Sequence, residues 1–406
     1  MEYKKKRGSG LGSALGFVLA VYAASRIFYL IAGAALVQVV PVNAFQSATT
    51  DDPFGTMNIW SHFDGEHYAR LASNGYLNPP SNMSPAFFPL YPLLIRAFAA
   101  SFGGPISVEV LAVWGVLISL LVLPFALYFV YRIAEHDYGA RVARGAVLGL
   151  AFFPTTFYLN ATYTESLFLA LSAGAIWAAR VRRDLLLACL LAGLATATRN
   201  VGLFLVLPLA YEWFRNIGYY RWWRVSYLAL APSGLVAYMG YQWWKFGSPF
   251  LFYTEQEEWN REASGPLETA SNAWREARDG VRWLFDPQVN IAGLDPNQLM
   301  AYLNSSNNTY NFIFLMLAAV LLAAGVRVLS PGMWGYAFLV SVFPAFFGAP
   351  GVTLMGLSRY VLVAFPLFIV LGVLLRNRIL LWTWLVSGAV FSLMLCAMFV
   401  TWWYVA

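Results

Sequence analysis

A short polar stretch near residue 64 combines two carboxylates with an imidazole. Asp64, Glu66 and His67 stand close together in the sequence. Asp64, His67 and Leu71 are spaced as i, i+3 and i+7, which places them on one face of a helix whose N-terminal dipole favours a carboxylate. A carboxylate there can take a proton from a hydroxyl group as a general base. It can equally cap the helix, and the pattern alone leaves both roles open.

Three further charged residues stand at the borders of apolar runs. Glu165 lies near the start of one run, Arg199 separates two short runs, and Arg359 opens another. A guanidinium group binds phosphate oxygens through two parallel hydrogen bonds and keeps its charge in a low-dielectric site. We therefore predict that Arg199 and Arg359 bind a phosphate group. Each charge taken alone could be an interfacial anchor, but their common depth favours one shared site.

Arg26 lies inside the first apolar run, where a charge needs a buried partner or a water-filled cavity. A structural ion pair with an acidic residue and a substrate-binding role both remain open.

The elements that position these residues follow from composition. The chain has 406 residues, of which 60% are hydrophobic and only 11% charged. A bilayer crossing needs about 20 apolar residues, so this length accommodates about ten or eleven crossings and two long loops. The apolar runs lack the alternation of barrel strands, and helices satisfy their own backbone in lipid. The sequence predicts an all-α polytopic membrane protein, embedded in the lipid bilayer as a single domain over 1–406.

Charge alternates along the chain in step with the predicted crossings. Basic residues concentrate on every second flank, starting with Lys4 to Arg7, and acidic residues concentrate on the others. This bias predicts a cytoplasmic N-terminus and a C-terminus on the extracytoplasmic face. The runs 185–198 and 200–214 are short, and we expect two irregular helices meeting at Arg199 and Asn200. The predicted crossings are 12–40, 108–132, 145–160, 163–180, 185–198, 200–214, 225–245, 310–327, 332–350, 359–376 and 379–403.

Two long segments, 41–107 and 246–309, fall on the outer side in this topology. The apolar stretch at 87–96 is too short and too broken by proline to cross the bilayer, so we expect a helix lying in the interface. The second segment reads as short amphipathic helices over the outer mouth of the bundle. The predicted site residues therefore gather on the extracytoplasmic side.

Several classes of function are disfavoured. The basic residues are scattered between apolar runs, which does not suit nucleic-acid binding. Cys189 and Cys396 both lie in apolar runs, and we infer no disulfide, no metal site and no cofactor. A phosphate-binding glycine-rich loop and a soluble nucleotide-binding domain are absent from the sequence. A transferase acting on the outer face would therefore use a sugar linked to a lipid phosphate.

Five blocks in one order resemble the phosphatidylinositol-glycan class V mannosyltransferases, which are GT-C glycosyltransferases. Phe63 stands where tryptophan is expected before the aspartate, and the chain ends in an aromatic tail, as the family does. The blocks are Phe63-Asp64-Gly65-Glu66-His67-Tyr68 with Asn74-Gly75-Tyr76, Ala86-Phe87-Phe88-Pro89-Leu90-Tyr91-Pro92-Leu93, Tyr163-Thr164-Glu165-Ser166-Leu167-Phe168, Ala197-Thr198-Arg199-Asn200-Val201-Gly202, and Ser358-Arg359-Tyr360 with Phe365-Pro366-Leu367.

The resemblance implies a GT-C-type bundle and a metal-independent, inverting transfer of mannose from a polyprenyl- or dolichyl-phosphate donor. It carries Asp64 over as the acidic residue of the first outer loop, our candidate base. The small size favours a prokaryotic plasma-membrane relative acting on a glycolipid or glycan acceptor, and we expect a monomer. Further expected substrate-binding residues are Glu66, His67, Glu165, Asn200, Arg26 and Tyr163.

Two other functional classes remain open from the sequence. A transporter or flippase of lipid-linked glycans would also keep polar residues in a membrane cavity, but it predicts them near mid-membrane. A non-catalytic membrane subunit would use the outer loops for partner binding and would tolerate loss of the Asp64 carboxylate.

Overall fold

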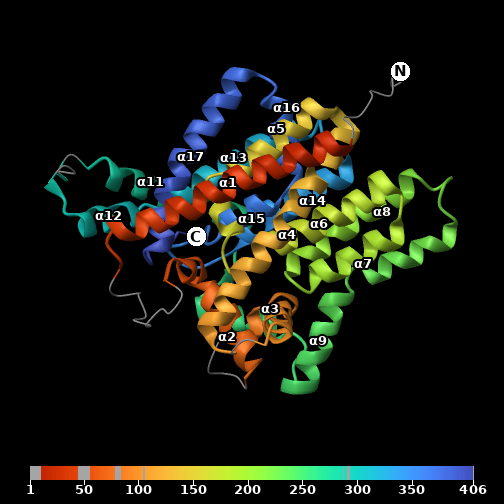
Figure 1. Cartoon of the computed structure of the whole chain (residues 1–406), viewed down its shortest axis with the longest axis horizontal. Coiled ribbons are helices and arrows are strands. Elements are labelled where there is room, and N and C mark those ends of the chain that lie inside the picture. The colour runs from red at the N-terminus through yellow and green to blue at the C-terminus, as the bar shows by residue number, and fades with distance from the viewer. Residues whose placement is uncertain are drawn as a thin grey trace.

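The computed structural model describes residues 11–43, 55–77, 84–103, 106–286, 288–289 and 293–405, and these are mostly helical (Figure 1). The predicted basic flank Lys4 to Arg7, parts of the first outer loop and Ala406 lie outside the described residues. The helices are α1 (Leu11–Val39), α2 (Asp64–Asn74), α3 (Leu90–Ser101), α4 (Val108–Tyr138), α5 (Ala140–Ala151), α6 (Glu165–Trp177), α7 (Leu185–Thr196), α8 (Val206–Arg215), α9 (Ser233–Phe246), α10 (Leu251–Thr254), α11 (Pro266–Leu284), α12 (Pro296–Asn304), α13 (Asn307–Gly325), α14 (Pro331–Ser341), α15 (Leu357–Val363), α16 (Pro366–Leu374) and α17 (Arg378–Val400).

Four of the described helices, α1, α4, α13 and α17, are long and apolar enough to cross a membrane, and α15 with α16 makes a fifth if the bent pair is one span. The protein is therefore an integral membrane protein. The predicted number of about eleven crossings is not established, because the other apolar runs fold as shorter helices joined by 3₁₀ turns or irregular backbone.

Two of the predicted crossings break where the sequence weakens the helix. The run 145–160 stops being helical at Ala151, just before Pro154, and α6 begins only at Glu165. The run 359–376 bends by 77° between α15 and α16, ahead of Pro366. Proline lacks an N–H donor and disfavours a helical residue before it, which explains both breaks.

The break expected between the two short runs is also present. The helix α7 ends at Thr196, Arg199 has an extended backbone with φ −154° and ψ 140°, and a 3₁₀ turn, η5 (Asn200–Leu205), leads into α8. The first residue of α3, Leu90, donates its N–H to the Ala197 carbonyl at 3.0 Å. The first outer loop is thereby tied to the point where the membrane helix breaks.

The helix α4 lies at the centre of the bundle and packs against α5, α6 and α2 (Figure 1). Close approach is possible because Gly115 faces the irregular segment before α6. A Cβ at Gly115 would stand 2.2 Å from the Thr162 Cγ2 atom, so only glycine allows this contact. The Thr162 hydroxyl donates to the Ala112 carbonyl at 2.7 Å. These contacts fix the backbone that leads to Glu165.

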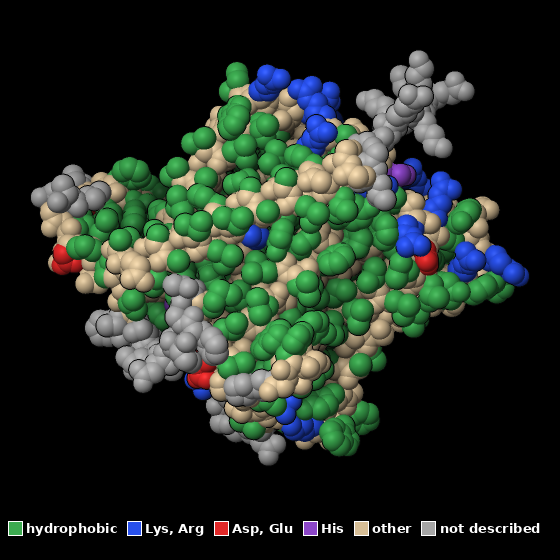
Figure 2. All heavy atoms as spheres, viewed as in Figure 1, with side chains coloured by type: hydrophobic (Ala, Val, Ile, Leu, Met, Phe, Trp, Pro, Cys, Tyr) green, Lys and Arg blue, Asp and Glu red, His purple; other side chains and the backbone are tan. Residues whose placement is uncertain are grey.

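Residues predicted on the cytoplasmic side lie together in space. Arg180 pairs with Asp137 at 2.8 Å and also with Glu212, and Arg141 donates to the Arg376 carbonyl at 2.9 Å. In Figure 2 the visible Lys and Arg side chains gather mainly along the top and right, where the ends of α5, α8 and α16 lie in Figure 1. The structure thus separates a basic end of the bundle from the end that holds α2, α3 and α11.

Both long outer segments contain helices, as predicted. The first holds α2 and α3, and α3 covers most of the stretch 87–96. The second holds α10, α11 and α12 together with β1 (Glu262–Ala263), which pairs antiparallel with β2 (Phe347–Gly348). This pairing ties the second outer loop to the segment that precedes α15.

Candidate active site

Four of the predicted residues form one ion-pair cluster. The Arg359 Nη1 donates to Asp64 Oδ2 at 2.5 Å, and its Nε donates to Glu165 Oε1 at 2.7 Å. The Arg199 Nη1 donates to the same Glu165 oxygen at 2.8 Å. The four residues come from the starts of α2, α6 and α15 and from the break after α7. Residues almost 300 positions apart in the sequence therefore share one site.

The first outer loop is fixed to the segment before α6, which explains why Asp64 and Glu165 can share Arg359. Trp60 accepts a backbone hydrogen bond from Thr162 at 2.9 Å. The Tyr163 hydroxyl donates to the His62 carbonyl at 2.9 Å. Asp64 follows within two residues of this anchor, and Glu165 lies two residues after Tyr163.

The four side chains of the cluster differ in their exposure to solvent. The Glu165 side chain is fully buried, whereas the Arg199 and Arg359 side chains are 11% and 14% exposed. The Asp64 side chain is 32% exposed, which makes it the most accessible carboxylate of the cluster. Of the four side chains, Asp64 is therefore the one that solvent reaches most readily.

Aromatic rings support the guanidinium groups. Arg359 lies over the rings of Tyr163 and Tyr158 at 4.6 and 5.4 Å, and Arg199 lies over Tyr360 at 4.9 Å. Such cation–π contacts are attractive and strengthen when the cation is desolvated. The rings hold the guanidinium planes while leaving their edges to hydrogen-bond. Among the described residues, the side-chain bonds engage Nε and Nη1 of Arg359 and Nη1 of Arg199, so Nη2 of each can serve an anion.

Asp64 is ionised at neutral pH. Burial alone raises its pKa, but the Arg359 guanidinium, with smaller contributions from His67 and Arg261, outweighs burial and holds the pKa below its ordinary value. Phe63, just before it, adopts the left-handed φ of 55° that is uncommon for a non-glycine residue. Its ring packs against Trp402 and Tyr404 at 5.4 and 5.8 Å, which holds this strained turn.

Other predicted residues lie beside the cluster without joining its hydrogen bonds. The Glu66 carboxylate accepts from Arg70 Nε at 2.9 Å on the exposed side of α2. The His67 ring stacks on Phe87 at 5.0 Å, and Asn200 is exposed at the start of η5. Tyr163 contacts the cluster directly, because the Arg359 guanidinium lies over its ring.

Arg26 lies elsewhere, and its partners are not acidic. Its Nη1 donates to the Thr156 carbonyl at 3.0 Å and to Asn160 Oδ1 at 2.8 Å, and its Nη2 donates to the Ala151 carbonyl at 3.3 Å. The residue is 3% exposed. Of the two roles left open for Arg26, the ion pair with an acidic residue is not formed in the described part of the chain. The guanidinium instead donates to carbonyl oxygens, including that of Ala151 at the end of α5, which has no helical partner. The substrate-binding role stays a prediction.

Sequence reasoning missed Arg261 and Tyr404. Both are close enough to Asp64 to interact with it electrostatically, and Arg261 also contacts Tyr360. Arg261 is one of several charged residues in the second outer loop, and no spacing distinguishes it from them. The aromatic tail was a visible signal for Tyr404, but not for its position beside Asp64.

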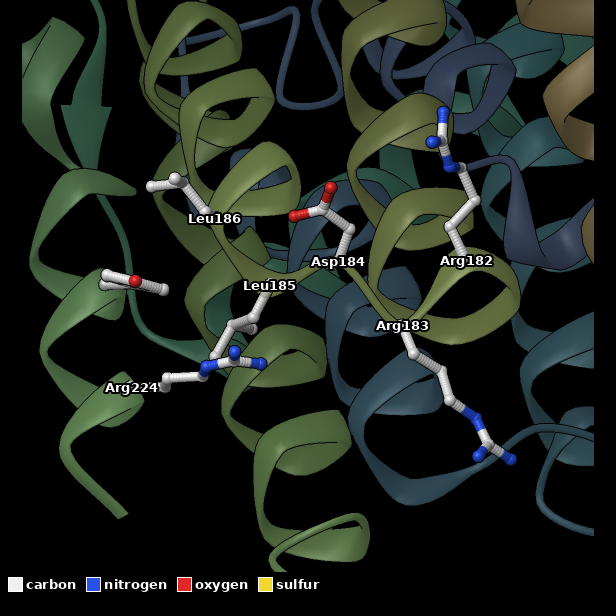
Figure 3. Close-up of a pocket in the computed structure, with 7 residues that line it drawn as sticks. Arg182, Arg183, Asp184, Leu185, Leu186 and Arg224 are labelled. Atoms are coloured by element: carbon white, nitrogen blue, oxygen red, sulfur yellow. The ribbon is translucent and has the colours of Figure 1, made fainter. Parts of the chain in front are cut away.

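A cavity of about 400 Å³ lies at the opposite, basic end of the bundle (Figure 3). Its lining includes Arg182, Arg183, Asp184 and Arg224. In Figure 3 the Arg182 and Arg183 side chains point away from each other, so they do not converge on one anion. This cavity is separate from the ion-pair cluster. Within the described ranges, no group of three or more His, Cys, Asp or Glu residues is placed to hold a metal ion.

A family model described as Mannosyltransferase (PIG-V) matches residues 11–221, which is more than half of the chain. No curated protein matches the sequence significantly. Among solved structures, ArnT from Cupriavidus metallidurans bound to undecaprenyl phosphate is similar over 88% of this chain and 78% of its own, with 14% identity and a TM-score of 0.40. The Archaeoglobus fulgidus oligosaccharyltransferase is similar over 92% of this chain, with 12% identity and a TM-score of 0.46. The chain spans 52% of that enzyme's length.

The family match, which includes Asp64, Glu165 and Arg199, decides the assignment. The chain belongs to the Mannosyltransferase (PIG-V) family and is a membrane glycosyltransferase.

Proposed function

We propose that this member of the Mannosyltransferase (PIG-V) family transfers mannose from a polyprenyl-phosphate donor to a glycolipid or glycan acceptor on the extracytoplasmic face. The observation that carries the proposal is the cluster in which Arg199 and Arg359 share Glu165 and Arg359 also pairs with Asp64. A carboxylate beside two guanidinium groups offers both a base for a hydroxyl and a site for a phosphate. The family assignment supports the sugar, and the absence of a nucleotide-binding loop from the sequence supports a lipid-linked donor.

In the proposed reaction Asp64 takes the proton from the acceptor hydroxyl. The acceptor oxygen then forms a bond to the anomeric carbon of the donor, and the bond from that carbon to the phosphate oxygen breaks. Attack from the face opposite the phosphate inverts the anomeric centre. Arg199 and Arg359 bind the departing phosphate, whose charge they stabilise in a water-poor site.

Glu165 has the role of orienting both arginines. It is fully buried and its Oε1 accepts from each of them, so it fixes their relative position before the donor binds. Arg359 has a second role, because its bond to Asp64 holds the carboxylate pKa down. A donor phosphate would compete with Asp64 for Arg359, and the weaker pairing would raise the pKa of Asp64. We therefore propose that donor binding makes Asp64 a stronger base.

Replacement of Asp64 tests this function directly. Purified protein in lipid nanodiscs would be incubated with synthetic polyprenyl-phosphate mannose and a panel of glycolipid and glycan acceptors, and products would be identified by mass spectrometry. We expect transfer by the wild type and a loss of at least about 100-fold in Asp64→Asn, since a positioned base contributes about 10²–10⁴.

The matched control is Asp279→Asn, which changes the same functional group in the second outer loop at a side chain that is 61% exposed. The control should keep wild-type activity. An Asp64→Asn variant that transfers mannose at the wild-type rate would refute the base assignment. A wild type that uses a nucleotide sugar instead would refute the lipid-linked donor.

A further inference from the structure

We propose that Arg261, in the second outer loop, is a third phosphate-binding residue of the donor site. This inference rests on the proposed function and deepens it, because it assigns a substrate contact to a loop outside the residues matched by the family model. The evidence is the position of the side chain, its incomplete hydrogen bonding and the charge balance of the site.

The backbone places Arg261 beside the start of α15. Asn260 adopts a left-handed conformation with φ 52°, which turns the chain. Arg261 follows it and directly precedes β1 (Glu262–Ala263), which pairs with β2. The Nη2 of Arg261 lies 4.0 Å from the position that a Cβ on Gly356 would take. Gly356 caps α15 with φ 75° and precedes Arg359 by three residues. The guanidinium of Arg261 therefore lies against the turn that carries Arg359.

Arg261 and Arg199 approach the same tyrosine from different sides. Arg199 lies over the Tyr360 ring at 4.9 Å, and Arg261 contacts the Tyr360 hydroxyl. Within the described part of the chain, the Arg261 Nε is buried and has no hydrogen-bond partner. A buried charged donor without an acceptor is unfavourable, whereas an oxygen from a bound phosphate would satisfy it.

Charge balance gives an independent reason for a third guanidinium. The site then holds three positive charges, from Arg199, Arg261 and Arg359, and two negative charges, from Asp64 and Glu165. A sugar linked through a phosphodiester adds one negative charge and makes the site neutral. After transfer Asp64 carries the proton, while the released phosphate monoester carries up to two negative charges. The site is again neutral. Without Arg261, both states would have one uncompensated negative charge in a buried site.

The test measures binding of two lipids that differ only in the phosphate. Wild type, Arg261→Gln and Arg261→Lys in nanodiscs would be titrated with undecaprenyl phosphate and with undecaprenol. We expect Arg261→Gln to weaken binding of the phosphate by about 10- to 100-fold, the scale of a charge-assisted hydrogen bond, and Arg261→Lys to lie between. Binding of undecaprenol should not change. The matched control is Arg282→Gln, in the same loop at a side chain that is 69% exposed, and it should bind both lipids like the wild type.

The outcomes separate this inference from the proposed function. If Arg261→Gln binds undecaprenyl phosphate as tightly as the wild type, or loses affinity for both lipids equally, Arg261 is not a phosphate-binding residue. The latter result would show a purely structural role in the loop. If the wild type itself does not distinguish undecaprenyl phosphate from undecaprenol, the proposed lipid-phosphate donor is wrong as well. Arg261→Lys, which keeps the charge, tests the inference if Arg261→Gln does not fold.

Discussion

Glu165→Gln should destabilise the protein more than its small change in shape suggests. The side chain is fully buried, and one oxygen accepts from both Arg199 and Arg359. The substitution keeps the volume but removes the negative charge between two guanidinium groups. Asp64 then remains as the carboxylate paired with Arg359, while Arg199 loses its acidic partner within the cluster.

The magnitude follows from the cost of an uncompensated buried charge. Removing one partner of a buried ion pair costs about 3–5 kcal/mol of unfolding free energy, whereas an exposed pair contributes about 0–1 kcal/mol. The pair between Glu66 and Arg70, with side chains 30% and 60% exposed, provides an internal control for an exposed ion pair. Glu66→Gln should therefore change stability by less than about 1 kcal/mol.

Equilibrium unfolding in mixed micelles, followed by tryptophan fluorescence, would measure these differences. A double-mutant cycle with Arg199→Gln isolates the contribution of the pair between Glu165 and Arg199. The double variant lacks both the carboxylate and the guanidinium group whose charge the carboxylate compensates. We expect the double variant to lose about 1–3 kcal/mol less unfolding free energy than the sum of the losses in the two single variants. Glu165→Gln within about 0.5 kcal/mol of the wild type, or additive effects in the cycle, would refute the buried ion-pair cluster.

Two further predictions concern the acid side of the pH range and Arg26. Because the folded-state pKa of Asp64 lies below its ordinary value, its pairing stabilises the fold fully above about pH 5 and is lost as pH falls through the folded pKa. The difference in unfolding temperature between wild type and Asp64→Asn should therefore be constant from pH 7 to 5 and shrink only at lower pH; shrinkage already between pH 7 and 5 would contradict the pairing. Arg26→Gln should cost about 1–3 kcal/mol or more by leaving carbonyl oxygens such as that of Ala151 unsatisfied, and Arg26→Lys should not restore it because lysine lacks the planar fork. A lysine variant as stable as the wild type in thermal unfolding would show that charge alone is required.

The sequence was most informative where a charged residue stands beside a break in an apolar run. Arg199 separates two apolar runs that are each too short to be an ordinary crossing, and Glu165 and Arg359 likewise stand beside breaks in apolar runs. In the structure each of these residues lies next to the end of a helix: Glu165 begins α6, Arg359 lies in the first turn of α15, and Arg199 follows α7. A charged residue at membrane depth requires polar surroundings, and a helix break supplies free backbone groups as well as space. Their convergence on Asp64 could thus be anticipated from topology, but the sharing of one Glu165 oxygen could not.

Topology fixes depth along the bundle axis but not direction around it, and this explains why the surroundings of Arg26 and Arg261 could not be predicted. The Arg26 side chain faces the end of α5, whose early termination at Ala151 hydropathy did not predict. Arg261, in contrast, was not singled out from the sequence. It lies in a polar loop where one more charge is unremarkable in the sequence, and only the pairing of β1 with β2 brings it to the turn before Arg359. That pairing joins residues 262–263 to 347–348 through backbone hydrogen bonds, which carry little side-chain signal. Sequence patterns therefore miss residues that such backbone pairing positions at a membrane site. This holds even for a residue that contacts the substrate, as we propose for Arg261.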